Sequence, residues 1–146
     1  MPLSVKDVMT PGVAAVRPEA SLVEAARLMR TQDIGEVLVA VGDHVVGVLT
    51  DRDITVRAVA EGDDPLGVTV GSVCTPSPVT VSPDDTVARV VALMRQHAVR
   101  RLPVIDGERP VGVVSLGDLA EFHDAESALG AISSADPNSL SGPRGL

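Results

Sequence analysis

Two stretches of the chain place a hydroxyl residue three positions before an aspartate, and an apolar residue directly follows that aspartate. The first stretch pairs Thr50 with Asp53, and the second pairs Ser115 with Asp118. At the start of a helix this spacing forms a capping box, in which the hydroxyl caps the helix and the acid favours its positive end. A carboxylate can also accept hydrogen bonds from the neighbouring hydroxyls of a ribose. The two uses are compatible, and the motif by itself does not choose between them.

The other reactive residue types form no recognisable site. Cys74 is the single cysteine, which excludes an internal disulfide and a thiolate metal cage. The three histidines, His44, His97 and His123, do not have the spacing of metal ligands. No serine elbow, phosphate-binding loop or dinucleotide fingerprint occurs. We therefore expect no enzymatic activity, no metal site and no cofactor.

The composition excludes further classes. With 45% hydrophobic and 22% charged residues the chain is typical of a globular protein, and no apolar run approaches the roughly 20 residues of a membrane span. The N-terminus has no apolar signal region, so we expect a cytoplasmic protein with no membrane partner. A net charge of −8 repels nucleic-acid phosphates, and a single aromatic residue, one phenylalanine, gives no platform for stacking bases. We expect no nucleic-acid partner.

An internal repeat relates the two motifs. When the chain is shifted by 65 residues, residues 5–54 fall on residues 70–119 without a gap. Identical pairs include Thr10 with Thr75, and most other pairs are conservative. The register holds through every turn, which indicates a tandem duplication.

Each copy is predicted to fold as β-α-β-β-α. In the first copy an extended piece at 13–17 precedes a helix capped by Ser21, and strands at 37–41 and 45–49 flank a glycine-containing turn. A final helix begins near Asp51. The second copy repeats these elements with an extended piece at 79–82, a helix capped by Thr86, strands at 102–105 and 111–115, and a final helix near Gly117.

A unit of this size, with a three-stranded sheet and its helices, buries too little surface alone. We therefore expect an α+β protein in which two β-α-β-β-α motifs pack with pseudo-two-fold symmetry. The predicted boundaries are 1–65 for the first motif with the start of a linker, 66–124 for the second motif, and 125–146 for a disordered tail rich in serine, glycine and proline.

Each unit ends in a characteristic stretch, GVLTDRDI at 47–54 and GVVSLGDL at 112–119. Together with VMTP at 8–11 and RRLPV at 100–104, these stretches resemble a tandem pair of cystathionine-β-synthase (CBS) domains, also called a Bateman module. The resemblance covers roughly residues 3–123. The chain looks like a stand-alone bacterial CBS-pair protein.

The resemblance implies two ligand sites in a cleft between the units, each drawing residues from both copies. The first would centre on Asp118 and Ser115, with Arg101 directed at a phosphate and walls from Thr10, Ala14, Ile34 and Gly35. The second would centre on Asp53 and Thr50, faced by Val79, Thr80, Val99 and Arg100.

The two sites differ at one aligned pair, because Arg101 in the second copy corresponds to Glu36 in the first. A guanidinium binds phosphate in a forked geometry, whereas a carboxylate repels it. On this ground we expect the site at Asp118 to bind a nucleotide better than the site at Asp53.

The leading hypothesis is a regulatory, allosteric module that senses AMP, ADP, ATP or S-adenosylmethionine, and whose ligand shifts the packing of the two units. The alternative is a structural or protein-interaction module that binds no ligand. The resemblance also implies a homodimer, in which two pairs form a flat disk. Apolar helix positions Leu28, Met29, Leu93 and Met94 fit either a dimer face or the core of the chain itself.

Overall fold

The computed structural model describes residues 3–123, and its first half contains the elements that the sequence predicts. After the short strand β2 (Ala15–Val16) come helix α2 (Leu22–Gln32) and the hairpin of β3 (Glu36–Val41) and β4 (His44–Thr50). Helix α3 (Asp51–Ile54) then continues into a π-helical turn, η1 (Thr55–Val59). The predicted order β-α-β-β-α is confirmed for the first copy.

The second copy repeats this order at the expected shift. An isolated bridge joins Val81 to Val104, where the first copy has β2. Helix α5 (Val87–His97), the hairpin of β6 (Arg101–Asp106) and β7 (Arg109–Ser115), and helix α6 (Leu116–His123) follow. The α+β fold class predicted from the duplication is confirmed, with two sheets and their helices.

Local chemistry accounts for the ends of these elements. The Ser21 hydroxyl accepts a hydrogen bond from the Glu24 backbone N–H at 3.1 Å, and Thr86 accepts one from Arg89 at 3.1 Å, so both predicted N-caps are confirmed. Gly42 and Gly107 have φ angles of +60° and +67° in the two hairpin turns. Two-residue hairpin turns need such angles, and glycine adopts them without a steric cost.

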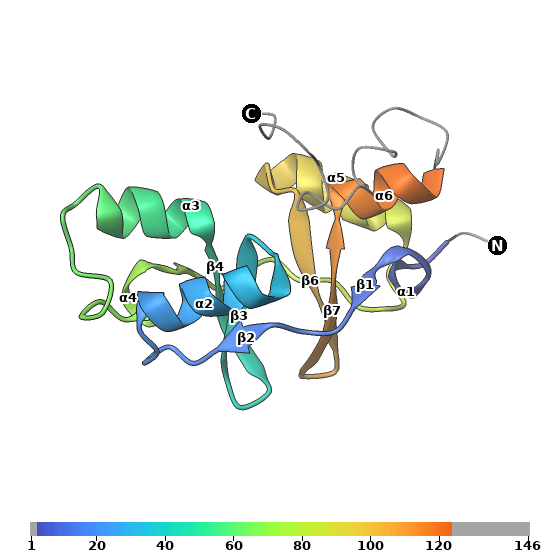
Figure 1. Cartoon of the computed structure of the whole chain (residues 1–146). Helices are drawn as coiled ribbons and strands as arrows, with labels where there is room; N and C mark the ends of the chain where they lie inside the picture. Colours follow the sequence, from blue (N-terminus) through green and yellow to red (C-terminus); the bar gives the residue numbers. More distant parts are fainter. Residues whose placement is uncertain (1–2, 124–146) are drawn as a thin grey trace.

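The first residues of each copy pack on the other copy. Helix α1 (Val5–Val8) leads to β1 (Thr10–Pro11), which pairs antiparallel with β7 of the second copy. Helix α4 (Val70–Val73) leads to β5 (Thr75–Pro76), which pairs with β4 of the first copy. Figure 1 shows β1, in blue, beside β7, in orange.

Because of this exchange, the sheets differ from the three-stranded sheets expected within each copy. One sheet has the order β2-β3-β4-β5 and the other β1-β7-β6. In each sheet the added edge strand comes from the other half of the chain, and it covers backbone groups that β4 or β7 would otherwise leave unpaired. The predicted boundary at residues 65 and 66 therefore divides two sequence repeats whose first residues are exchanged in space. The predicted tail at 125–146 lies outside the described residues.

Each half has its own apolar core, and the exchange extends into both. Val70, from the start of the second copy, is fully buried in the first core with Leu22, Val39 and Leu49. Val5, from the start of the first copy, is fully buried in the second core, whose other members include Val90, Leu102 and Val114. Two halves that share their cores in this way are held together by the hydrophobic effect as well as by strand pairing.

Of the helix positions that fitted either a dimer face or the core, the two methionines lie in the core and the two leucines are partly buried against it. Met29 and Met94 are only 6% and 8% exposed, and Leu28 and Leu93 pack against the same two clusters. The exposed large apolar residues include Val59 on η1 and Phe122 on α6. Among the described residues, no helix combines the length and the apolar character that crossing a bilayer requires.

Candidate ligand site between the two repeats

The second hydroxyl–aspartate motif lies at the end of β7 and the start of α6. The Ser115 backbone N–H donates to Oδ2 of Asp118 at 2.9 Å, and the Asp118 N–H donates to the Ser115 hydroxyl at 3.0 Å. This reciprocal pair is the predicted capping box. A third hydrogen bond crosses between the repeats, because the Thr10 hydroxyl donates to Oδ1 of Asp118 at 3.0 Å. Asp118 is thus fixed by both halves of the chain.

The first motif has the same capping box but a different neighbour. The Thr50 N–H donates to Oδ2 of Asp53, and the Asp53 N–H donates to the Thr50 hydroxyl, both at 3.0 Å. Oδ1 of Asp53, whose side chain is only 15% exposed, lies 3.6 Å from the guanidinium of Arg57. Arg57 also donates to the Val73 carbonyl at 2.8 Å and to the Thr75 hydroxyl at 3.2 Å. Arg57 therefore contacts the threonine equivalent to Thr10.

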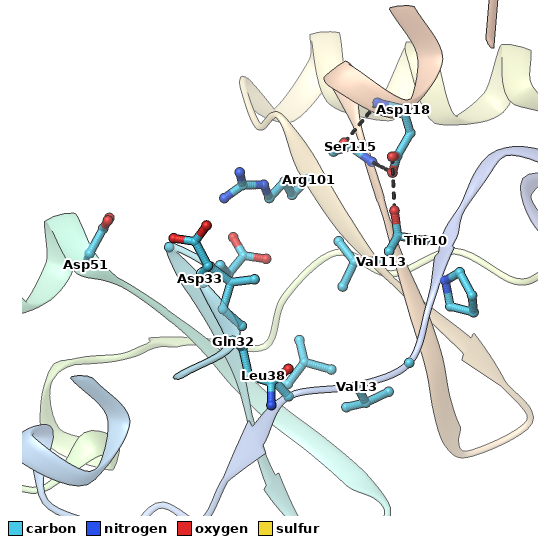
Figure 2. A pocket seen from close by; sticks show the side chains of 16 residues that line it. Thr10, Val13, Gln32, Asp33, Leu38, Asp51, Arg101, Val113, Ser115 and Asp118 are labelled. Atoms are coloured by element: carbon cyan, nitrogen blue, oxygen red, sulfur yellow. Dashed lines mark hydrogen bonds between the residues drawn. The ribbon is translucent and has the colours of Figure 1, made fainter. Parts of the chain in front are cut away.

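A cavity of about 830 Å³, which we call the Asp118 cavity, opens between the two halves. It is lined by all seven residues predicted for the first site: Thr10, Ala14, Ile34, Gly35, Arg101, Ser115 and Asp118. Figure 2 shows Arg101 extending from β6 into this space and Asp118 hydrogen-bonded to Thr10. The structure brings these residues together, and their role in binding stays a prediction.

A second cavity of about 990 Å³, the Asp53 cavity, also draws on both halves. Of the residues predicted for the second site, Thr50, Asp53, Val79, Val99 and Arg100 line it. Thr80 is not part of its lining and is exposed. Successive residues of an extended segment point to opposite sides, so Val79 faces the cavity and Thr80 turns away.

The pair of residues that led us to rank the two sites is shared by both cavities. Glu36 and Arg101 each line both cavities. The strands that carry them, β3 and β6, begin at these equivalent positions of the two repeats. The pair Arg101 and Glu36 therefore does not by itself rank the two cavities for phosphate. The ranking of the two sites stays a prediction, and it depends on the other charged residues of each cavity.

Glu36 is a titratable group at this junction. Burial raises the pKa of the Glu36 carboxyl above its usual value of 4.5; the positive charge of Arg101 lowers it in part, and the negative charge of Asp53 raises it further. A raised pKa means that the folded protein favours the neutral carboxyl more than the unfolded chain does.

Three residues that matter for the cavities were missed from the sequence. Asp33 ends helix α2 in a left-handed conformation and lines the Asp118 cavity, and Asp51 lines both cavities. Arg57 forms an ion pair with Asp53. The sequence contained a signal for this pair, because opposite charges four residues apart in a helical segment lie side by side. Within residues 3–123, no three His, Cys, Asp or Glu side chains gather as ligands of a metal ion would.

The comparisons with known sequences agree with the duplication. The family model for the CBS domain matches residues 5–59 and again residues 70–124. The CBS domain-containing protein YhcV of Bacillus subtilis is 43% identical over 118 residues, which cover 80% of this chain and 83% of YhcV. Hypoxic response protein 1 of Mycobacterium tuberculosis is 37% identical over 125 residues, which cover 85% of this chain and 87% of that protein.

Solved structures share the fold. The crystal structure of Hypoxic Response Protein I with two coordinated zinc ions has a TM-score of 0.74 at 35% identity, covering 82% of this chain and 98% of that chain. The CBS domain pair of MJ0100, solved in complex with 5′-methylthioadenosine and S-adenosyl-L-methionine, has a TM-score of 0.77 over 87% of this chain and 100% of that chain. At 23% identity it shows a common fold only. With a matching domain in each half, this chain belongs to the CBS domain family.

Proposed function

We propose that this chain is a non-catalytic regulatory module that binds an adenine nucleotide or an S-adenosyl compound in the cavities between its two CBS motifs. One observation carries the proposal: Asp118 of the second repeat lies at the wall of a cavity and is held there by Thr10 of the first repeat. A ligand at this carboxylate contacts both repeats. Its binding free energy can therefore bias how the repeats pack.

The acceptor capacity of Asp118 suits a ribose. Each carboxylate oxygen already accepts one hydrogen bond, from Thr10 at Oδ1 and from the Ser115 N–H at Oδ2. An ionised carboxylate has about four acceptor positions, so each oxygen can take one more donor. Two neighbouring ribose hydroxyls are such a pair of donors. The cap and the ribose contact are therefore compatible at one side chain.

The walls of the cavities suit an adenine ring. Ala14, Ile34 and Leu38 line the Asp118 cavity, and Val48, Val79 and Val99 line the Asp53 cavity. Cavity volumes of several hundred Å³ with apolar walls and a few polar groups are typical of small-molecule sites. The CBS pair of MJ0100 holds two adenosyl compounds in the same fold, which supports this ligand class for the present chain.

Calorimetry and thermal unfolding with AMP, ADP, ATP and S-adenosylmethionine test the proposal. A ligand that binds only the folded chain raises the unfolding free energy by about 2.7 kcal/mol at 100 times its Kd, and the melting temperature rises with it. We expect Asp118→Ala and Asp53→Ala to weaken binding each at its own cavity. Ser21→Ala and Thr86→Ala, which remove helix caps outside both cavity linings, are the matched controls for lost stability. No heat and no melting shift with any of the four compounds at millimolar concentration would overturn the proposal.

A second candidate function is that of an interaction module, and exposed apolar side chains favour it. Val59 on η1 and Phe122 on α6 are 57% and 49% exposed, and Val56 on η1 is also exposed. We propose that these helices form the contact of a homodimer. Light scattering should show a dimer that Val59→Glu together with Phe122→Glu dissociates. Val41→Glu, at an equally exposed position in the β3–β4 hairpin, is the control. A monomer in the unmodified protein would refute this contact.

A further inference from the structure

The two cavities carry different charges, although the repeats that build them are similar. The Asp118 cavity has one cationic side chain, Arg101, against four carboxylates, which are Asp33, Glu36, Asp51 and Asp118. Figure 2 shows Asp33 and Asp51 on the side of the cavity that the first repeat forms, and Asp118 on the side that the second repeat forms. A phosphate in this space would meet an excess of negative charge.

The Asp53 cavity has as many cations as carboxylates. Its acidic residues are Glu36, Asp51 and Asp53, and its arginines are Arg52, Arg100 and Arg101. Two of these arginines have uncharged counterparts at the equivalent positions of the other repeat, because Arg52 aligns with Gly117 and Arg100 with Gly35. The difference in charge between the cavities therefore comes from positions at which the two repeats of this chain have different residues.

Arg57 increases the difference. Its guanidinium lies 3.6 Å from Oδ1 of Asp53 and places a positive charge beside the carboxylate that would face a ribose there. The equivalent position of the second repeat is Phe122, which brings no charge to Asp118. An arginine that is also held by the Val73 carbonyl and the Thr75 hydroxyl stays in place without a ligand. Asp53 is thus a paired carboxylate, whereas the neighbour of Asp118 is the neutral hydroxyl of Thr10.

We propose that the two cavities sort adenine ligands by charge: the Asp53 cavity binds the ligand that carries a phosphate, and the Asp118 cavity binds an uncharged or cationic nucleoside. The inference rests on the proposed function, since it assigns ligand classes within the same two cavities. It reverses the order expected from the pair Arg101 and Glu36, because both of those side chains line both cavities.

A matched pair of tryptophan reporters separates the two cavities. Ile34 and Val99 occupy equivalent positions in the repeats, and Ile34 lines only the Asp118 cavity while Val99 lines only the Asp53 cavity. The chain has no tryptophan, so Ile34→Trp and Val99→Trp each give a single fluorophore that reports one cavity. Adenosine and AMP are the probes, because they differ only in the phosphate. S-adenosylmethionine is the cationic probe.

At Val99→Trp we expect AMP to bind at least about tenfold more tightly than adenosine, which corresponds to about 1.4 kcal/mol. At Ile34→Trp we expect AMP to bind at least about tenfold more weakly than adenosine, and S-adenosylmethionine to bind at least as tightly as adenosine. Adding Asp33→Asn to Ile34→Trp should tighten AMP binding. Asparagine tolerates the left-handed conformation of this residue, so the change removes charge without strain.

Calorimetry on chains without tryptophan gives an independent measurement. Arg100→Gln should weaken AMP binding about tenfold and leave adenosine binding within a factor of about two. Arg95→Gln removes the same charge from helix α5 outside both cavity linings and is the control for net charge. A ratio of AMP affinity to adenosine affinity at Ile34→Trp that equals or exceeds the ratio at Val99→Trp would overturn the sorting and leave the proposed function intact. No binding of any probe, in the reporters or by calorimetry, would overturn both.

Discussion

The Thr10 hydroxyl donates a hydrogen bond to Oδ1 of Asp118 over 3.0 Å, and this contact connects the first repeat to the aspartate of the second. Thr75 and Asp53 have no such contact; instead Arg57 donates a hydrogen bond to the Thr75 hydroxyl and forms an ion pair with Asp53. Two identical threonine–aspartate pairs in the repeat thus have different surroundings. One aspartate is fixed by a neutral donor and the other by a cation.

Thr10→Val should lower the free energy of unfolding by up to about 1 kcal/mol. The substitution keeps the size of the side chain and removes the hydroxyl donor, and a single net hydrogen bond contributes on this order. Urea unfolding followed by circular dichroism measures the change. Thr10→Ser keeps the hydroxyl donor, so its free energy of unfolding should be close to that of the unmodified protein. An equal loss in the serine variant would show that the hydroxyl is not responsible.

Removing the hydroxyl of either capping box should lower the stability of the fold by a similar amount. Thr50→Ala and Ser115→Ala should each cost about 1 kcal/mol of stability, because each leaves a helix N–H of α3 or α6 without its side-chain acceptor. The swaps Thr50→Ser and Ser115→Thr retain that acceptor and should stay within about 0.5 kcal/mol. The same urea assay applies. Alanine variants as stable as the swaps would contradict the capping role.

The exchanged strand β1 lies so close to β7 at Gly112 that a side chain at this position would meet it. A Cβ at this position would come within 2.5 Å of the Thr10 carbonyl oxygen and 3.3 Å of the Pro11 Cα. We expect Gly112→Ala to destabilise the fold by roughly 1–3 kcal/mol, since backbone atoms must move to admit the methyl group. Gly67→Ala is the control, because the only atom within 4 Å of its added Cβ lies at ordinary contact distance, 3.6 Å. Similar melting temperatures for the two variants would contradict the close contact.

Glu36 predicts a pH dependence whose sign follows from its raised pKa. The folded state holds the Glu36 proton more tightly than the unfolded chain does, so the contribution of Glu36 to stability falls as pH rises from about 4.5 through the folded pKa. Glu36→Gln removes this term. The variant should be more stable than the unmodified protein at pH 7, and the difference should disappear below about pH 4. Urea unfolding across this range measures it, and a variant that is less stable at pH 7 would contradict the prediction.

The sequence by itself determined the β-α-β-β-α elements of each copy and their order, but not α1, β1, α4 and β5. Hydroxyl caps at Ser21 and Thr86, glycines at the hairpin turns and a shared 65-residue shift are local signals, and local backbone chemistry acts the same way in each copy. The capping boxes at Asp53 and Asp118 were predicted for the same reason. The residues of the Asp118 cavity were brought together as the family resemblance implied.

Only the tertiary structure decided which half each opening segment joins. Val5 and Val70 begin the two copies in helices of four residues. Helices this short have no periodic pattern from which the sheet that they pack on could be predicted. Burial in the opposite core settles it. The tertiary structure also decided which charged side chains line each cavity. Glu36 and Arg101 are the first residues of β3 and β6, and both line both cavities. The packing of the two halves, which no local signal encodes, produces this arrangement.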